Sequence, residues 1–175
     1  MIEARGIIPN IEQCIMRVES LGGIFKNRYA FTDIIFMPTD RVIDLNSEFI
    51  RLRIYKENGW PTKNIILTHK MSSWTGSSKI DTLLVKEEFD TIHEAAEFIK
   101  KNYDNKIGEG FKYARKGWMY TVGKIKVYIE QIERFPPSIE VQADTESDIA
   151  DFFKLVGVTQ RVSESAPEFM RKILT

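Results

Sequence analysis

The sequence predicts an α+β protein in which antiparallel strands enclose a polar interior and helices pack against the outside. Three observations lead to this prediction. About eight segments alternate with the period of a β-strand, several of them carry charge on one face and apolar residues on the other, and the helical segments have one apolar stripe. A closed sheet with inward charges explains this pattern better than a β-sandwich, because the inner faces of a sandwich are apolar.

Composition narrows the classes of protein. The chain has 175 residues, 43% of them hydrophobic and 29% charged, which suits a single domain over residues 1–175. Its 25 basic and 25 acidic residues cancel, so no overall field favours nucleic acid or an anionic membrane, and any polyanion site must be local.

Location follows from what the sequence lacks. The single cysteine cannot form an internal disulfide, and no apolar run approaches the roughly 20 residues of a membrane span. The first residues also lack the apolar core of a signal peptide. We therefore expect a cytoplasmic protein.

The first elements are a strand over residues 1–8, a helix whose first turn begins at Pro9 and a long strand over 24–36. The helix ends at Gly22-Gly23. Cys14 lies in its apolar stripe, where we expect it to serve packing rather than nucleophilic chemistry.

The strand over residues 48–55 is the centre of the functional prediction. Ile50, Leu52 and Ile54 lie on one face, and Arg51 and Arg53 on the other. Two adjacent guanidinium groups are favourable where an anion with several oxygens or a set of carboxylates lies over them. The alternative is a solvated outer face. The recurrence of charged faces on other strands favours the first interpretation.

A hairpin turn is expected over 56–61, where Asn58-Gly59 suits positive φ, and its partner strand over 64–71. Ile66, Thr68 and Lys70 share one face of this strand, so the right register adds Lys70 to the arginines. His69 lies on the opposite face and is expected to have hydrogen-bond partners rather than a metal. The Ser- and Gly-rich segment 72–78 reads as a connection between strands.

The remaining elements are assigned in the same way. Strands are expected over 80–89, 111–121, 124–132 and 138–142, and helices over 91–102, over 144–156 and from Ser165 onward. Thr91 and Glu94 form a capping box, which places His93 in an exposed first turn.

The order of several short motifs resembles the CYTH superfamily of triphosphate tunnel metalloenzymes, which includes class IV adenylate cyclases, thiamine triphosphatases and inorganic triphosphatases. The resemblance spans nearly the whole chain. The motifs are Glu3-Ala4-Arg5, Asp33-Ile34-Ile35-Phe36, Arg51-Leu52-Arg53, Lys70, Arg115-Lys116-Gly117-Trp118, Ile129-Glu130-Gln131-Ile132 and Ser138-Ile139-Glu140-Val141-Gln142.

The resemblance implies an eight-stranded antiparallel tunnel and a metal-dependent enzyme, either a triphosphatase or an adenylate cyclase. The substrate would be ATP, thiamine triphosphate or tripolyphosphate, with Mg²⁺ or Mn²⁺ as the cofactor. The triphosphate-binding residues implied are Arg5, Arg51, Arg53, Lys70 and Arg115. The metal ligands implied are Glu3, Glu130 and Glu140.

Three departures from the family pattern, two of which remove a carboxylate, leave alternatives open. Met1 stands at the first glutamate of the opening Glu-x-Glu-x-Lys motif and Arg5 at its lysine, while Gln142 replaces the second glutamate of the closing pair. In the fifth strand, Glu88 is the expected interior residue. The absence of carboxylates at positions 1 and 142 favours an alternative function, a non-catalytic module that binds polyphosphate or a nucleotide. A plain structural domain and a homodimer also remain open.

Overall fold

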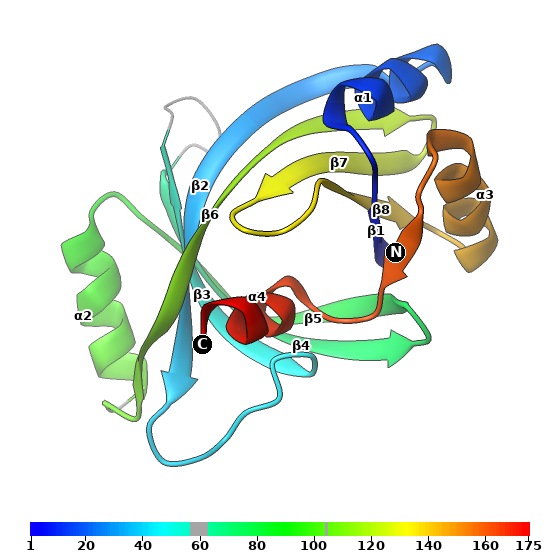
Figure 1. The fold of residues 1–175 in the computed structure, drawn as a ribbon. Coiled ribbons are helices and arrows are strands. Elements are labelled where there is room, and N and C mark those ends of the chain that lie inside the picture. The colour runs from blue at the N-terminus through cyan, green and yellow to red at the C-terminus, as the bar shows by residue number, and fades with distance from the viewer. Residues whose placement is uncertain (57–62, 104) are drawn as a thin grey trace. The chain divides into compact units, whose positions relative to one another are not determined.

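The computed structural model describes residues 1–56, 63–103 and 105–175. Along the chain the elements are β1 (Ile2–Ile7), α1 (Ile11–Ser20), β2 (Ile24–Pro38), β3 (Glu48–Tyr55), β4 (Ile65–Thr75), β5 (Ser78–Phe89), α2 (Ile92–Tyr103), β6 (Ile107–Val122), β7 (Ile125–Ile132), β8 (Ser138–Ala143), α3 (Glu146–Val156), β9 (Gln160–Val162) and α4 (Ala166–Leu174) (Figure 1).

Strand pairing confirms the predicted fold class. Neighbouring strands follow the order β5-β4-β3-β2-β6-β7-β8-β1-β9. Strand β5 also pairs with β1 in antiparallel register, with Glu3 opposite Lys79. The eight long strands therefore form a closed order of pairing, as expected for an α+β protein with a closed antiparallel sheet.

The described residues fall into two compact units. Unit 1 contains 1–28, 73–80 and 115–164, and unit 2 contains 29–72, 81–114 and 165–175. Several long strands contribute residues to both units. The single domain expected from the sequence stays a prediction, and each unit is described by itself.

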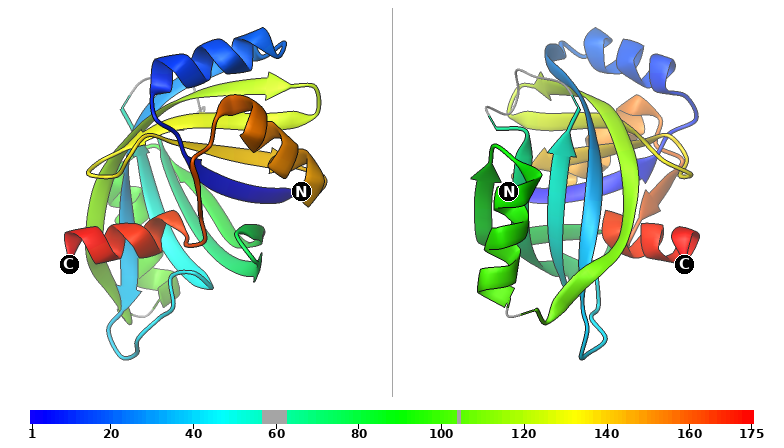
Figure 2. Two further views of the ribbon diagram at one scale, coloured as in Figure 1. Left: turned by 45° about the vertical axis from the view of Figure 1, so that its right-hand side comes forward. Right: turned by 90° about the vertical axis from the view of Figure 1, so that its left-hand side faces the viewer.

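Unit 1 has an apolar core on one face of β1, β7 and β8. Val127 and Ile129 of β7 and Ile139 and Val141 of β8 are fully buried. Helix α1 packs over β7, and α3 packs over β8 and β1 (Figures 1 and 2). Because side chains alternate along a strand, the opposite face of β7 carries Glu130, as the sequence predicts.

Unit 2 repeats this arrangement on β3 and β4. Ile50 and Leu52 of β3 and Leu67 of β4 join a buried cluster with Ala95 of α2. Helix α2 runs alongside these strands in the right-hand view of Figure 2. The apolar residues of β3 thus lie under a helix, and Arg51 and Arg53 lie on the other face, as expected.

Helix starts agree with capping chemistry more closely than with the predicted boundaries. Helix α1 begins at Ile11, because Asn10 accepts a hydrogen bond from the Gln13 N–H at 2.9 Å; Pro9 therefore precedes the cap. In the same way α3 starts after Thr145 rather than at 144. The capping box of α2 is confirmed, since Thr91 and Glu94 bond reciprocally.

The structure differs from the sequence-based prediction in two further segments, residues 72–78 and β9. The connection expected over 72–78 is wrong, because β4 continues to Thr75 and β5 begins at Ser78, with Gly76 at φ 61° in the turn. Ser72 is held in β4 by its 2.7 Å bond to Asp81. The three-residue β9 was not predicted. Most of the turn expected over 56–61 lies outside the described residues.

Candidate functional site

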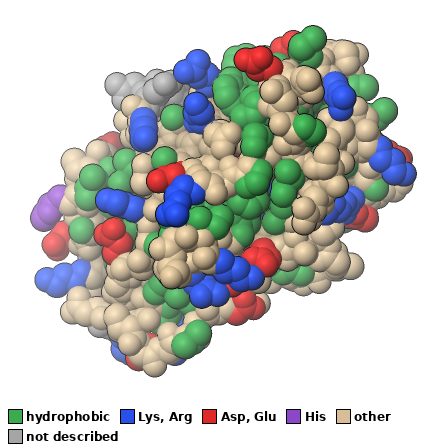
Figure 3. Space-filling model, viewed as in Figure 1, with side chains coloured by type: hydrophobic (Ala, Val, Ile, Leu, Met, Phe, Trp, Pro, Cys, Tyr) green, Lys and Arg blue, Asp and Glu red, His purple; other side chains and the backbone are tan. Residues whose placement is uncertain are grey.

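The face drawn in Figure 3 carries both basic and acidic side chains. Lys and Arg side chains lie interspersed with Asp and Glu on the face drawn in Figure 3, in keeping with equal numbers of basic and acidic residues. Within the described part of the chain, no helix has the length and apolar character needed to cross a membrane. The cytoplasmic location stays a prediction, and a local site must supply any affinity for a polyanion.

The register of β3 and β4 brings three predicted cations to one face of unit 2. Arg51 lies opposite Thr68, and Lys70 lies opposite Phe49. Antiparallel partners share a face, and residues two apart on a strand also share it. Arg51, Arg53 and Lys70 therefore point to the same side of the sheet, as the alternation predicts.

This face forms a cavity of about 320 Å³, which we call the cationic cavity. Its volume lies at the lower end of the range for small-molecule sites. Four of its residues are basic and one is acidic. The lining residues are Arg51, Arg53, Tyr55, Ile66, Thr68, Lys70, Leu83, Lys86 and Glu88. The position of Glu88 agrees with its predicted inward direction.

A buried carboxylate fixes the two arginines. Asp33 is fully buried and lies opposite Arg53 in the β2–β3 register. The Arg53 Nε and Nη2 atoms donate to Asp33 Oδ1 and Oδ2 at 2.7 and 2.9 Å, and Arg51 Nε lies 3.9 Å from Oδ1. The Arg53 guanidinium also lies 3.6 Å from the centre of the Phe31 ring. Arg53 is therefore held rigidly before any ligand arrives.

Lys70 is positioned from the neighbouring strand. Its Nζ lies 3.2 Å from Asp81 Oδ2, and the other oxygen of Asp81 accepts a bond from Ser72. Lys70 keeps 25% of its side-chain surface exposed. A lysine ammonium has three hydrogen-bond donors and can therefore bind more than one oxygen at a time.

Thr68 supplies a polar group that the sequence did not identify as functional. Thr68 is only 7% exposed, and its Oγ1 has no hydrogen-bond partner among the residues that the structure describes. A buried hydroxyl without a partner costs free energy, and most such groups in proteins are satisfied. Because Thr68 lines the cationic cavity, its hydroxyl can donate a hydrogen bond to an oxygen-rich ligand there.

Unit 1 contains a second charged cluster, centred on Arg5, which we call the Arg5 network. Arg5 Nη1 lies 2.8 Å from Glu130 Oε2, and Nη2 lies 2.6 Å from Glu140 Oε2. Arg5 also donates to Ser138 Oγ at 2.8 Å. Arg115 Nη1 lies 3.3 Å from the same Glu130 oxygen. Two predicted phosphate ligands and two predicted metal ligands thus contact one another.

The Arg5 guanidinium stays charged despite its burial. Burial alone lowers the pKa of Arg5, but the charges of Glu130 and Glu140 together outweigh it and raise that pKa above its ordinary value. Arg5 is only 5% exposed. Arg5 is therefore a permanently ionised side chain inside unit 1.

The third predicted metal ligand, Glu3, is also paired. Its Oε1 lies 2.5 Å from Lys79 Nζ, and its Oε2 accepts a bond from the Gln142 amide at 3.2 Å. Lys79 lies directly opposite Glu3 in the β1–β5 pairing. The glutamine that departs from the family pattern therefore contacts one of the expected metal ligands.

We tested whether these carboxylates fit the divalent metal that the resemblance implies. Glu130 and Glu140 each contact Arg5, and Glu3 contacts Lys79, so every member of the set already has a cation beside it. Across residues 1–56, 63–103 and 105–175, no three His, Cys, Asp or Glu side chains come together as metal ligands. The arrangement of these carboxylates does not fit a divalent metal.

His69 and Cys14 have structural roles. His69 Nε2 lies 2.7 Å from Glu48, and the Tyr103 hydroxyl lies 3.3 Å from Nδ1, so the expectation of a satisfied histidine is confirmed. His93 is exposed, as expected. Cys14 is buried, and this burial raises the pKa of its thiol to about 12. Such a thiol is protonated at neutral pH and is a poor nucleophile.

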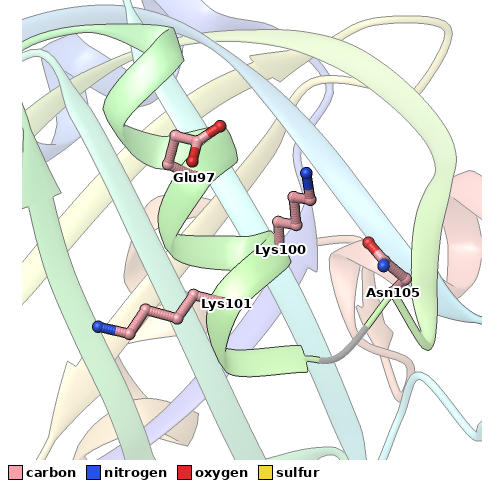
Figure 4. A pocket seen from close by; sticks show the side chains of 4 residues that line it. All are labelled: Glu97, Lys100, Lys101 and Asn105. Carbon is pink, nitrogen blue, oxygen red and sulfur yellow. The ribbon is translucent and has the colours of Figure 1, made fainter.

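A further hollow of about 520 Å³ lies at the C-terminal end of α2 (Figure 4). Its lining residues are Glu97, Lys100, Lys101 and Asn105, all of them exposed. Their side chains point in different directions in Figure 4, and Lys101 points away from the others. This hollow lacks the convergent polar groups of a binding site.

Comparison with known proteins gives the fold. No model of a protein family matches the sequence, and no curated protein matches it. Among solved structures, the PH1819 protein from Pyrococcus horikoshii has a TM-score of 0.76 at 16% identity, covering 99% of this chain and 97% of that one.

Two further solved structures carry functional descriptions. HpAC1 from Hippeastrum, described as a candidate adenylyl cyclase with dominant triphosphatase activity, has a TM-score of 0.71 at 14% identity, covering 98% of this chain and 95% of its own. A candidate adenylate cyclase from Vibrio parahaemolyticus has a TM-score of 0.67 at 12% identity, covering 96% and 95%. At 12–16% identity these likenesses show the fold alone, and the fold expected from the resemblance to the CYTH superfamily is confirmed.

Proposed function

We propose that the protein binds a triphosphate-containing small molecule in the cationic cavity and acts on it, as a triphosphatase or, with ATP, as an adenylate cyclase. The observation that carries this proposal is the cavity itself, with four basic side chains and one acidic side chain in its lining. Solved structures of the same fold include candidate cyclases and a protein with dominant triphosphatase activity.

The cavity suits a phosphate chain in its donor chemistry. Arg51 and Arg53 present planar guanidinium groups, which bind phosphate oxygens through two parallel hydrogen bonds. Lys70 adds a compact charge, and Thr68 adds a hydroxyl that lacks a partner in the described part of the chain. In phosphoryl transfer, catalysis comes mainly from positioned groups that stabilise charge on the transferred phosphoryl.

The same residues supply the positioning that the reaction needs. Asp33 holds Arg53 at two points, so the guanidinium does not have to be ordered when the ligand binds. Tyr55, Ile66 and Leu83 give the cavity an apolar part beside its cations. We propose no contact of the triphosphate with Arg5 on present geometry, because carboxylates and Ser138 occupy its terminal nitrogens. The predicted role of Arg115 stays a prediction.

The reaction is tested by incubating the protein with tripolyphosphate, ATP and thiamine triphosphate. Each substrate is supplied with Mg²⁺, with Mn²⁺ and with a chelator, and phosphate and cyclic AMP are measured. Release of phosphate identifies a triphosphatase, and formation of cyclic AMP identifies a cyclase. Absence of turnover under all these conditions overturns the enzymatic proposal. Comparison of the metal and chelator samples decides whether turnover depends on metal.

Binding is tested separately by calorimetry with tripolyphosphate. Arg53→Ala is expected to weaken binding by about 1–3 kcal/mol, because it removes a charged hydrogen-bond donor. Arg41→Ala is the control, since Arg41 belongs to the same unit, is 57% exposed and does not line the cavity. Equal affinity of the two variants would place the ligand elsewhere.

A second function, a binding module without catalysis, is favoured by one specific observation. All three carboxylates that the resemblance assigns to the metal contact basic side chains. Saturable binding of tripolyphosphate without turnover of any substrate would support this function. A homodimer stays a prediction, which sedimentation of the purified protein tests.

A further inference from the structure

The Arg5 network places a cation between two carboxylates from neighbouring strands. Glu130 belongs to β7 and Glu140 to β8, and Arg5 lies opposite Glu140 in the β1–β8 register. One guanidinium reaches both, with its two terminal nitrogens 2.8 Å from Glu130 and 2.6 Å from Glu140. It therefore occupies the space between the oxygens that a bridging metal ion would use.

The burial of Arg5 and Glu130 disfavours a second cation beside them. Glu130 is 3% exposed and Arg5 is 5% exposed, so solvent screens their charges poorly. Arg115, itself 7% exposed, lies 3.3 Å from the Glu130 oxygen that Arg5 contacts. A divalent ion at these carboxylates would lie beside two fixed guanidinium groups, and like charges at such distances repel strongly where water is excluded.

Charges within the Arg5 network balance without a metal. Arg5 and Arg115 carry two positive charges, and Glu130 and Glu140 carry two negative charges. The neighbouring pair of Glu3 and Lys79 is neutral by itself. Mg²⁺ also requires ordered oxygen ligands in near-octahedral geometry and gives up its waters reluctantly. Removing Arg5 would leave one net negative charge on the remaining three residues, Arg115, Glu130 and Glu140.

We infer that the Arg5 guanidinium is an internal cation that takes the place of a divalent ion between Glu130 and Glu140. The free protein therefore holds neither Mg²⁺ nor Mn²⁺ at these two carboxylates, and a single substitution at Arg5 opens them to metal. This inference concerns unit 1 and goes beyond the proposed function, which concerns the cationic cavity of unit 2. Failure of triphosphate binding leaves it unaffected.

Titration with Mn²⁺, followed by the electron paramagnetic resonance signal of the free ion, tests the inference without any substrate. The wild type is expected to show no saturable binding up to about 1 mM, and Arg5→Ala is expected to bind at least about tenfold more tightly. Glu140→Gln in the Arg5→Ala background should abolish the new binding, because it removes one of the two ligands.

Arg161→Ala is the matched control. Arg161 also pairs with one glutamate of unit 1, Glu146, but that glutamate is half exposed, and no second carboxylate of the described residues is paired with Arg161. Its removal should leave Mn²⁺ affinity at the wild-type level. If Arg5→Ala and Arg161→Ala gain affinity equally, the inference is overturned.

Folding of each variant is checked by circular dichroism, since loss of Arg5 removes one cation from the buried Glu130 and the Arg5 contact from Glu140. Arg5→Gln, which keeps hydrogen-bond donors without the charge, replaces Arg5→Ala if the latter does not fold. If neither variant folds, Mn²⁺ binding is compared between the wild type and Glu140→Gln. Saturable Mn²⁺ binding that is lost in Glu140→Gln overturns the inference, and absence of such binding supports it.

Discussion

Asp33 and Arg53 face each other across β2 and β3, and two hydrogen bonds of 2.7 and 2.9 Å join their side chains. Asp33 has no exposed surface, whereas 16% of the Arg53 side chain is exposed at the cationic cavity. The pair thus links a buried anion to a cation on the cavity wall. Its loss should affect stability and ligand binding together.

Asp33→Asn is expected to lower the free energy of unfolding by about 3 kcal/mol, because it removes one partner of a buried ion pair and leaves the other charged. Urea denaturation measures this change. Asp90→Asn is the control, since Asp90 pairs with Lys63 at 3.4 Å but is 68% exposed. We expect a change of less than about 0.5 kcal/mol there. Equal losses in the two variants would contradict the structural role of Asp33.

Thr68→Val separates ligand binding from folding. The hydroxyl that it removes is buried and has no partner in the described chain, so the free energy of unfolding should stay constant or rise. If that hydroxyl donates to a bound phosphate, the affinity for tripolyphosphate should fall by about 0.5–1.5 kcal/mol. Calorimetry and urea denaturation measure the two quantities. Unchanged affinity would show that Thr68 does not contact the ligand.

The buried thiol of Cys14 should lower the free energy of unfolding at alkaline pH. Burial raises the pKa of its thiol from 9.0 to about 12, although Arg17 lowers it slightly. Between these values the unfolded chain releases a proton that the folded chain keeps. The contribution is therefore fully present below pH 9 and is lost as pH rises toward 12, by about 1.4 kcal/mol per pH unit.

Cys14→Ala removes this titration and provides the comparison. From pH 8 to 10.5, the free energy of unfolding of the wild type should fall by about 2 kcal/mol more than that of the variant. Denaturation in urea at the two pH values measures the difference. Parallel losses in both proteins would mean that the thiol titrates normally in the folded state.

Ser165→Ala is expected to destabilise unit 2 by about 1–2 kcal/mol. Ser165 caps α4, accepting a bond from the Glu168 N–H at 3.2 Å, and its hydroxyl donates to the Leu45 carbonyl at 2.6 Å. Both bonds are buried and would be lost. Thr175→Ala, at the exposed end of the same helix, should change stability by less than about 0.5 kcal/mol. Urea denaturation distinguishes the two.

Alternation along strands accounts for what the sequence predicts well. Because successive side chains point to opposite faces, the spacing of Arg51, Arg53 and Lys70 was enough to place all three on one side of β3 and β4. The capping box of α2 was predictable for a similar reason, since both of its residues lie within one turn.

Long-range pairing accounts for what the sequence does not reveal. Arg5 lies far from Glu130 and Glu140 in the chain, and nothing local shows that it binds them rather than a phosphate. Lys79 was missed because it falls between the connection predicted over 72–78 and the strand predicted over 80–89, whereas β5 begins at Ser78 and pairs with β1. Polar composition alone does not distinguish a loop from a strand whose serine finds a distant partner.

Burial is equally hidden from the sequence. Thr68 was placed on the correct face, but no local signal indicates that its hydroxyl is enclosed without a partner. Asp81, Lys86 and Ser138 were missed as site residues for the same reason, because their roles depend on neighbours from other strands.

Odd- and even-numbered residues of β3 and β4 lie on opposite faces of the sheet and have different roles. In β3 the odd-numbered Arg51 and Arg53 line the cationic cavity, and the even-numbered Ile50 and Leu52 pack under α2; in β4 the parity is reversed. Tolerance to substitution along these strands should therefore oscillate with a period of two residues. Substitutions on the cavity face would alter what the protein recognises. Substitutions on the face under α2 would alter how much folded protein a cell retains.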